Sequence, residues 1–250
     1  MKFLAFIKEN RAFLIFVAFL FIFRGAIADW HPVPTGSMKP TILEGDVVWE
    51  NKLAYDLQIP FTDISLVRLG EPKRGDIIVF TSAAAKKRMI KRLVGLPGET
   101  IEVKNNLLYI NGVKSEYSHP KDQTLEPKRP IDKETDGIYA MESRTDLKPH
   151  IVQVKPHFAN FNPLRNYPPQ EQLGYPCLTD MNRPIKIPED HYFVMGDNRD
   201  NSADSRCYGF IPRSEIRGHA TSTVMSVITK KSWAIWNWRF RPERFFDSLK

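Results

Sequence analysis

The stretch Arg74-Gly75-Asp76-Ile77-Ile78-Val79-Phe80 joins a polar Gly-Asp turn to an apolar run of strand length. Gly45–Trp49 repeats this arrangement, with Gly-Asp followed by Val-Val-Trp. Met89–Val94 is another short run, and the turn residues Gly95–Gly98 end it. Short apolar runs separated by Gly and Pro turns are typical of β-strands. We therefore expect a sheet in this part of the chain.

Further strands are predicted towards the carboxyl end. Ile101–Val103 and Leu107–Ile110 flank Asn105-Asn106 and predict a hairpin. Apolar runs resume at Tyr192–Met195 and at Ala220–Ile228. Outside the amino terminus no long amphipathic helical pattern appears, so the predicted fold class is all-β.

The middle of the chain, from about Ser115 to Pro188, has a different composition. It contains eleven of the 19 prolines and few periodic runs. We expect an irregular, mostly extended insertion without a strong core of its own.

Composition excludes several classes of protein. The chain has 250 residues, of which 42% are hydrophobic, and its net charge is +7. These values exclude wholesale disorder, and the Gly and Pro residues follow no repeat period. The charge is compatible with an anionic partner such as lipid headgroups. Whether Cys177 and Cys207 pair cannot be read from the sequence.

The amino terminus allows two interpretations. Ala12–Phe23 is a run of twelve apolar residues that follows a basic flank. It matches a signal-peptide core with Ala26-Ile27-Ala28 as the cleavage site. It also matches a short membrane span from about Phe13 to Trp30, with Arg24 reaching the outer interface. Both interpretations leave the first ten residues in the cytoplasm and place the body of the protein outside it.

The carboxyl-terminal stretch Lys230–Lys250 also has two interpretations. It carries three tryptophans, Trp233, Trp236 and Trp238, among six basic residues. Tryptophan mixed with cations suits a membrane interface, but a packed terminal strand with a basic edge explains it equally well.

Metal and nucleic-acid sites are not predicted. The six histidines show no i, i+4 pair, and no Cys-x-x-Cys is present. The segment beginning at Asp200 resembles a calcium loop, but Ser205 replaces the required Gly and Ile211 the required Glu. The basic residues are dispersed along the chain, unlike those of a nucleic-acid-binding face.

Three segments contain candidate catalytic groups. In Pro34–Thr41, two prolines stiffen a loop that exposes Ser37, although the loop alone is explained equally well as a plain turn. In the strand at 89–94, Lys91 shares a face with Met89 and Leu93, which would desolvate its amine and lower its pKa. A surface lysine that extends its amine into solvent is the alternative.

The third segment is Gly196–Arg206, in which nine of the eleven residues are polar. It directly follows a predicted strand. A solvated loop is the ordinary interpretation, and a hydrogen-bonded scaffold beside an active site is the functional one.

Together these segments resemble bacterial type I signal peptidase, the leader peptidase family of membrane-bound serine proteases. Five motifs carry the resemblance, in the order that the family has them: Pro34–Thr41, Gly45–Val48, Arg74–Phe80, Lys91–Glu99 and Gly196–Arg206. The resemblance implies a membrane-bound endopeptidase that removes signal peptides from exported preproteins, with no cofactor and no metal.

The resemblance also implies roles for individual residues. Ser37 would be the nucleophile and Lys91 the general base, with Ser202 hydrogen-bonded to Lys91. The Ser37 backbone N–H and the Thr35 hydroxyl would form the oxyanion hole, with Thr standing where many members have Ser. An ion pair of Asp204 with Arg206 would support the site. Small apolar pockets for the substrate would be formed by five residues: Val33, Pro34, Met38, Ile42 and Ile90.

The fold that the resemblance implies is an antiparallel β core with an inserted β-rich region and a retained amino-terminal transmembrane helix. Retention would place the protein in the bacterial inner membrane, with phospholipid and preproteins as its partners and Ala26-Ile27-Ala28 as a target for self-cleavage. The expected segments are a cytoplasmic end at 1–11, an anchor at 12–30, the catalytic core at 31–99 and 189–229, an insertion at 100–188 and a tail at 230–250.

Two other classes of protein are alternatives to this interpretation. A self-cleaving repressor shares the Ser-Lys pair, but it would be cytoplasmic and would carry a DNA-binding head, which this chain lacks. An exported β-rich binding protein, with Ser37 and Lys91 as plain surface residues, is the non-enzymatic alternative.

Overall fold

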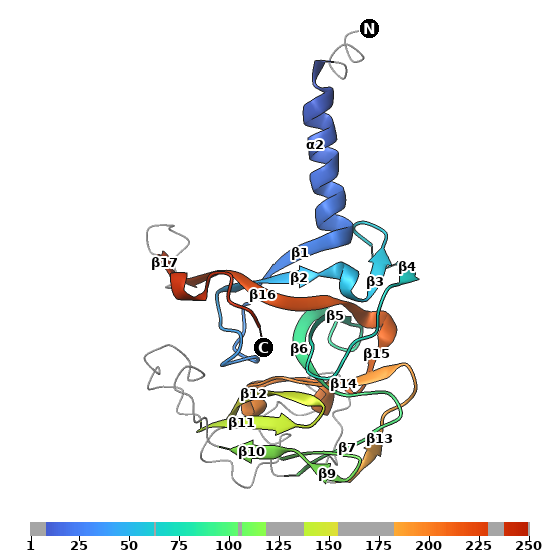
Figure 1. Cartoon of the computed structure of the whole chain (residues 1–250), viewed down its shortest axis with the longest axis vertical. Helices are drawn as coiled ribbons and strands as arrows, with labels where there is room; N and C mark the ends of the chain where they lie inside the picture. Colours follow the sequence, from blue (N-terminus) through green and yellow to red (C-terminus); the bar gives the residue numbers. More distant parts are fainter. Residues whose placement is uncertain are drawn as a thin grey trace.

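A computed structural model describes residues 9–62, 64–104, 107–118, 138–154, 183–229 and 238–249. Within these residues an eight-stranded antiparallel sheet forms the centre of the molecule (Figure 1). In spatial order its strands are β1 (Ala28–Pro32), β2 (Asp46–Asn51), β16 (Ile216–Thr229), β5 (Ile77–Ser82), β6 (Lys87–Gly95), β14 (His191–Met195) and β15 (Ile211–Pro212), and β17 (Trp238–Phe240) pairs with β16.

The Gly-Asp turns lead into strands as predicted. Gly75 has a φ of +92°, a conformation that glycine adopts without strain, and β5 begins two residues later. β5 and β6 pair antiparallel, with Ile78 opposite Lys91. The antiparallel, mainly β fold is therefore confirmed.

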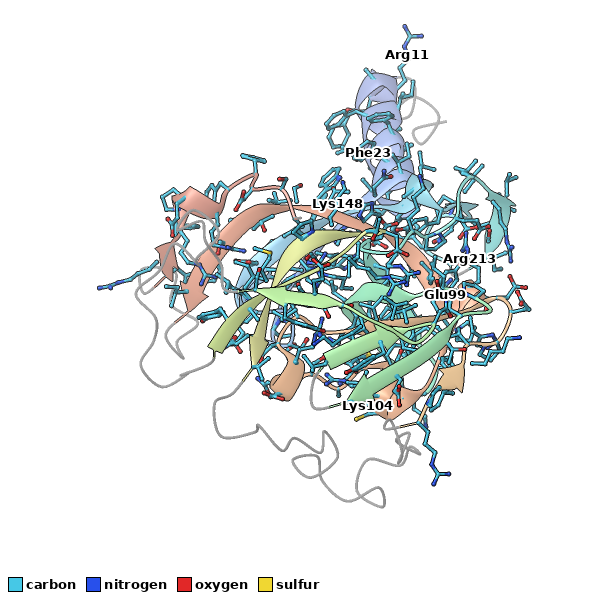
Figure 2. All side chains as sticks on the ribbon, turned by 60° about the horizontal axis from the view of Figure 1, so that its bottom comes forward. Arg11, Phe23, Glu99, Lys104, Lys148 and Arg213 are labelled. Atoms are coloured by element: carbon cyan, nitrogen blue, oxygen red, sulfur yellow. The ribbon has the colours of Figure 1, made fainter. Side chains whose placement is uncertain are left out.

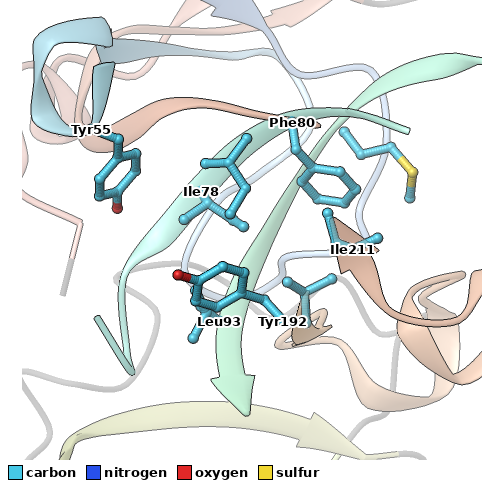
Figure 3. Packing of buried hydrophobic residues seen from close by; sticks show 9 residues of the cluster. Tyr55, Ile78, Phe80, Leu93, Tyr192 and Ile211 are labelled. Carbon is cyan, nitrogen blue, oxygen red and sulfur yellow. The ribbon is translucent and has the colours of Figure 1, made fainter. Parts of the chain in front are cut away.

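The central core is built on the neighbouring strands β5, β6 and β14. Figure 3 shows Ile78, Phe80, Leu93 and Tyr192 packed together with Tyr55 and Ile211. A second cluster contains apolar side chains of the strands β7 (Thr100–Lys104) and β8 (Leu107–Ile110). A third cluster contains Val33, Met38 and Ile42, so the loop that carries Ser37 is itself part of the packed interior.

The insertion is more regular than predicted. β11 (Ile138–Arg144) and β12 (Leu147–Val154) form an antiparallel hairpin that β10 (Glu116–Ser118) extends. Leu147, Ile151 and Val152 are buried beneath it, so this sheet has apolar contacts of its own. Sparse periodicity concealed the hairpin, because Pro149 interrupts its second strand. Residues 119–137 and 155–182, with Cys177, lie outside the described part of the chain.

A second sheet of the insertion lies beside the first, at the end of the molecule opposite the amino-terminal helix (Figure 1). The predicted hairpin at 101–110 is present in it. Its four strands are β13 (Ile185–Lys186), β7 (Thr100–Lys104), β8 (Leu107–Ile110) and β9 (Val113–Lys114).

The remaining elements are short. β3 (Asp56–Gln58) and β4 (Ser65–Arg68) form a separate two-stranded hairpin. Single helical turns occur at Lys52–Ala54 (η2), Arg199–Asn201 (η4), Ser205–Tyr208 (α4), Arg213–Glu215 (η5) and Pro242–Arg244 (η7).

The amino-terminal helix projects away from the β body (Figures 1 and 2). It consists of α2 (Arg11–Ile22) and a π-helical turn, η1 (Phe23–Ile27). Within the described residues, no helix combines the length and apolar character needed to cross a bilayer. At the end of the expected segment 12–30, Ala28–Trp30 belong to β1, where pairing with β2 satisfies their backbone groups. Ala26 and Ala28 are buried, which conceals the predicted cleavage site.

The carboxyl-terminal tail is described from Trp238 onward. There it forms β17, which pairs with the end of β16, as the packed-strand interpretation expects. Trp233 and Trp236 lie outside the described residues.

Candidate active site

Ser37 and Lys91 meet in space although 54 positions separate them in the chain. Ser37 lies in the loop between β1 and β2, and Lys91 lies in the middle of β6. Nζ of Lys91 is 2.6 Å from Oγ of Ser37, which is hydrogen-bond distance. The other hydrogen bond of the amine, at 3.0 Å, is to the backbone carbonyl of Ile90.

Burial changes the acid–base chemistry of Lys91. The side chain is only 4% exposed, between Met89 and Leu93 on the same face of β6. Desolvation is the largest effect and lowers the pKa of Lys91 to about 8, with a further lowering from the charge of Lys87. Asp204 and Asp197 act in the opposite sense without cancelling it. A neutral amine is thus accessible near neutral pH, and it can accept a proton from the serine hydroxyl.

Ser202 differs from its predicted contact. Its hydroxyl donates to Oδ2 of Asp204 at 2.7 Å, whereas the two hydrogen bonds described for Lys91 go to other groups. The prediction of a Ser202–Lys91 hydrogen bond is therefore corrected. The carboxylate of Asp204 is a stronger hydrogen-bond acceptor than a neutral amine nitrogen, so the Ser202 hydroxyl donates its hydrogen bond to Asp204.

Asp204 and Arg206 form the predicted ion pair. Nε and Nη2 of Arg206 each lie 2.8 Å from a different carboxylate oxygen of Asp204. Burial alone would raise the pKa of Asp204, but Arg206 outweighs that effect and holds the pKa below its usual range. This fixed carboxylate also accepts the Gly196 N–H at 2.9 Å. The pair therefore binds both ends of the polar loop next to the serine and lysine.

An open cavity of about 490 Å³ lies beside Ser37 and Lys91. Its walls include all five predicted pocket residues, Val33, Pro34, Met38, Ile42 and Ile90, together with Thr35. The floor is formed by Met38 and Ile42, which are 2% and 0% exposed and so are fixed in the packed interior. A shallow apolar cavity next to a nucleophile can hold a small side chain of an extended peptide.

The sequence of this chain is similar to those of known proteins. The model of the family described as "Signal peptidase, peptidase S26" matches residues 6–225. The chain belongs to this family. A relative in Rickettsia akari, named signal peptidase I, is 35% identical over 89% of this chain and 79% of its own length. Signal peptidase I of Buchnera aphidicola subsp. Schizaphis graminum is 32% identical over 85% of this chain and 73% of its own length.

Among solved structures, a signal peptidase I from Enterococcus faecalis is 27% identical and matches 61% of this chain and 98% of its own, with a TM-score of 0.33. Membership of the signal peptidase family makes the chain a serine endopeptidase by class.

The sequence interpretation of this family member gave no individual role to four residues of the site, Thr41, Arg92, Asp197 and Asn198. Asp197 accepts two hydrogen bonds from Arg92, at 2.9 and 2.8 Å, and another from the Thr41 hydroxyl. Asn198 donates from its backbone to the Ser37 carbonyl at 3.1 Å and from its side chain to the Gly36 carbonyl at 3.0 Å. These contacts hold the serine loop against the lysine strand. The polar loop was noticed as a scaffold, but the partners of its members depend on long-range packing.

One group of potential metal ligands exists among the described residues. Ligand atoms of Asp29, His31 and Glu50 lie within 4.8 Å of one another. Two cations already pair with Asp29, Arg24 at 3.2 Å and Lys52 at 3.5 Å, and His31 bonds Glu50 at 2.6 Å. Because these cations would repel a metal ion, the arrangement fits an internal ion network.

Proposed function

We propose that this protein is a membrane-bound endopeptidase that removes amino-terminal signal peptides from exported preproteins. The observation that carries this proposal is the buried Lys91 amine, which lies 2.6 Å from the Ser37 hydroxyl at the wall of an apolar cavity. The names of the relatives supply the substrate class.

The reaction follows from the positions of these groups. Neutral Lys91 accepts the hydroxyl proton of Ser37 while Oγ attacks the scissile carbonyl carbon. The backbone N–H of Ser37 and the hydroxyl of Thr35 stabilise the resulting oxyanion. Lys91 then gives its proton to the departing amine, which leaves an acyl ester on Ser37. Water hydrolyses the ester with Lys91 again acting as base.

The cavity accounts for the choice of cleavage site. Val33, Ile42 and Ile90 line the cavity next to the nucleophile, and we expect the apolar surface there to accept a small side chain such as alanine. A substrate with small residues at alternate positions, such as Ala-x-Ala, places both small side chains on the same face of an extended strand.

We propose that the amino-terminal helix anchors the enzyme in the bacterial inner membrane, with residues 1–11 in the cytoplasm and the catalytic body outside. Phe13, Phe16 and Phe19 are all exposed on α2, so water would meet an apolar helix. Arg24 marks the outer interface, because it pairs with Asp29 and lies 4.5 Å from the centre of the Trp30 ring. The tail at 230–250 would lie near the same interface.

The division into a catalytic core at 31–99 and 189–229, with an insertion at 100–188, belongs to the same proposal. The strand that follows the serine loop (β2), the strand that carries Lys91 (β6) and the strand that precedes the polar loop (β14) all fall within the core segments. The two sheets of the insertion contain none of the proposed catalytic groups.

Hydrolysis of a fluorogenic peptide with Ala-x-Ala before the cut tests the proposal. We expect wild type to cleave it, and Ser37→Ala and Lys91→Met to lose activity by several orders of magnitude. Lys91→Arg is expected to be inactive as well, because a guanidinium does not lose its proton at working pH. Preprotein processing in lipid vesicles provides the second measurement. Full activity in Ser37→Ala would contradict the Ser-Lys mechanism, whereas absence of cleavage by wild type would favour the alternative, a β-rich binding protein without catalysis.

A further inference from the structure

The cavity of the candidate active site is basic at one end. Its lining includes His31, Lys87, Arg88 and Lys91, and none of the described residues that line it is acidic. His31 already has a negative partner, because its Nε2 lies 2.6 Å from Oε2 of the fully buried Glu50. Lys91 acts in the reaction itself. The two remaining cations, Lys87 and Arg88, have no part in the mechanism.

Lys87 and Arg88 carry charges that the protein does not compensate. They are the first two residues of β6, and both are exposed. In the described part of the chain, neither side chain forms an ion pair with a carboxylate. The charge of Lys87 reaches the reacting groups, since it contributes to the lowered pKa of Lys91. Two adjacent cations on the wall of a cavity favour an anionic ligand.

The walls of the cavity show where a substrate would meet these cations. One wall leads from His31 through Val33 to Ser37, and the other follows β6 from Lys87 to Lys91. Both walls run towards the serine and lysine, so their upstream residues lie at the same end of the cavity. The small side chains before the cut occupy the apolar part in between. Residues still further from the cut therefore extend into the basic end.

The spacing of β6 identifies the substrate residue that reaches the basic end. β14 pairs with β6 from Arg92 onward, and the stretch 87–91 pairs with β5. An extended peptide and a strand both rise about 3.3 Å per residue. With the residue before the cut level with Lys91, Lys87 is level with the fifth residue before the cut. Alternate side chains share a face, so this fifth residue points the same way as the small first and third residues.

We propose that Lys87 and Arg88 form a subsite for an acidic side chain, aspartate or glutamate, at the fifth residue before the cut in a preprotein. The proposal rests on the proposed function, because it describes part of the substrate of the same site. A single exposed ion pair contributes little, but here two cations act on one carboxylate at the wall of a cavity. A basic side chain at that position would be repelled, so the subsite discriminates between preproteins by charge.

Cleavage of three matched peptides tests the subsite. Each fluorogenic peptide has Ala-x-Ala before the cut, and the fifth residue before the cut is Glu, Gln or Lys. Rates are measured in non-ionic detergent at low salt and at about pH 9.5, where Lys91 is mainly neutral. For wild type we expect kcat/KM to be about fivefold higher with Glu than with Gln, and about fivefold lower with Lys, mainly through KM. Added salt should reduce both differences, and moving the Glu to the seventh residue should remove its advantage.

Variants of the two cations provide the controls. For Lys87→Gln/Arg88→Gln we expect equal rates with the three peptides, and for Lys87→Glu/Arg88→Glu we expect the Lys peptide to be preferred. Such a reversal does not arise from misfolding. Lys86→Gln/Lys114→Gln removes two exposed cations that do not line the cavity, and it should keep the wild-type ratios. Because the peptides are compared within each variant, a change in the pKa of Lys91 cancels.

The outcomes that overturn the subsite are distinguishable from failure of the proposed function. If wild type cleaves the three peptides equally, the subsite is wrong and the proposed function stands. If wild type cleaves none of them, both are wrong. A preference for Glu that persists in Lys87→Gln/Arg88→Gln would mean that other groups bind the acid. If this variant keeps the wild-type ratios in detergent and loses activity only in vesicles that contain phosphatidylglycerol, the cations bind lipid headgroups instead, and the subsite is wrong.

Discussion

At the scale of single residues, Lys91 acquires its chemistry from burial. An opposing carboxylate would hold the amine in its charged form, yet the hydrogen bonds of Nζ go to a hydroxyl and a backbone carbonyl. Asp204, the carboxylate of the polar loop that raises the pKa of Lys91 most, is paired with Arg206. Diverting that negative charge to an arginine allows desolvation to dominate the pKa of Lys91.

The first prediction concerns pH. Because only neutral Lys91 accepts a proton, kcat/KM should rise with pH through a pKa of about 8 and then level off. Two pH units below that pKa the rate should be roughly 100-fold lower. Lys87→Gln removes a neighbouring charge that lowers the pKa of Lys91, so its profile should shift to higher pH. A peptide-cleavage profile that is flat from about pH 6 to 9 would contradict the lysine base.

The second prediction concerns stability. The folded pKa of Lys91 is lower than the unfolded value, so the unfolded chain binds more protons between about pH 8 and 10.5. Stability contributed by this residue should therefore rise with pH across that window. Lys91→Met removes the buried amine and should raise the free energy of unfolding at pH 7 by on the order of 2 kcal/mol. Thermal unfolding in detergent measures it, and a lower melting temperature than wild type would contradict it.

At the scale of elements, the active site is the place where the serine loop, the strand β6 and the polar loop meet, and close backbone contacts hold these segments together. Gly196 lies where β14 ends and the polar loop begins, and a Cβ there would lie 2.2 Å from Oγ of Ser202 and 2.4 Å from the Ser37 carbonyl oxygen. The absence of a side chain lets the polar loop approach the serine loop closely enough for Asn198 to bond both Gly36 and Ser37.

The third prediction follows from this contact. Gly196→Ala should push the Ser37 loop away from Lys91, because the clash involves backbone as well as side-chain atoms. A displacement of about 1 Å is expected to lower kcat about 100-fold. Gly112→Ala is the control for strain remote from the active site, since no atom lies within 4 Å of its added Cβ but its φ of +76° disfavours a side chain. If peptide cleavage by Gly196→Ala matched that of the control, the close approach would have no functional role.

At the scale of the whole molecule, the insertion braces the active site from behind. The insertion contacts the polar loop through β12, where the Gln153 N–H donates a hydrogen bond to the Asp197 carbonyl at 2.8 Å. Glu142 on β11 pairs with Arg199 in the same loop, and both side chains are fully buried. Despite burial, Arg199 and His150 hold the pKa of Glu142 well below its usual range.

The fourth prediction tests this brace. Glu142→Gln leaves Arg199 as a buried charge without its carboxylate, which should cost about 3–5 kcal/mol of stability. We expect kcat to fall where the variant is still folded, while the pKa seen in the pH profile stays that of Lys91. Glu116→Gln on exposed β10 is the control. Calorimetry and peptide cleavage measure the two effects. Unchanged stability in Glu142→Gln would contradict the bracing role.

The hairpin in the insertion and the hairpin β3–β4 show the limit of sequence interpretation. Strands that alternate or run continuously apolar, such as β5 and β6, were predicted because local periodicity reflects which face is buried. β11–β12 was missed because its buried residues include Glu142, whose partner Arg199 is 57 positions away. The apolar side chains of β4 are exposed, so an apolar pattern there does not predict burial in the protein core.

Local patterns alone determined the all-β class and identified Ser37 and Lys91 as candidate catalytic groups, because both depend on side-chain type and local spacing, which a linear sequence contains. Antiparallel pairing and the apolar residues of the cavity came from the resemblance of the five motifs to the family. Tertiary structure alone decided that Ser202 bonds Asp204 and that Asn198 supports Ser37. It also decided that the insertion reaches the polar loop. These contacts join distant positions, and a buried hydrogen-bonding group selects its partner by distance and angle in the packed interior.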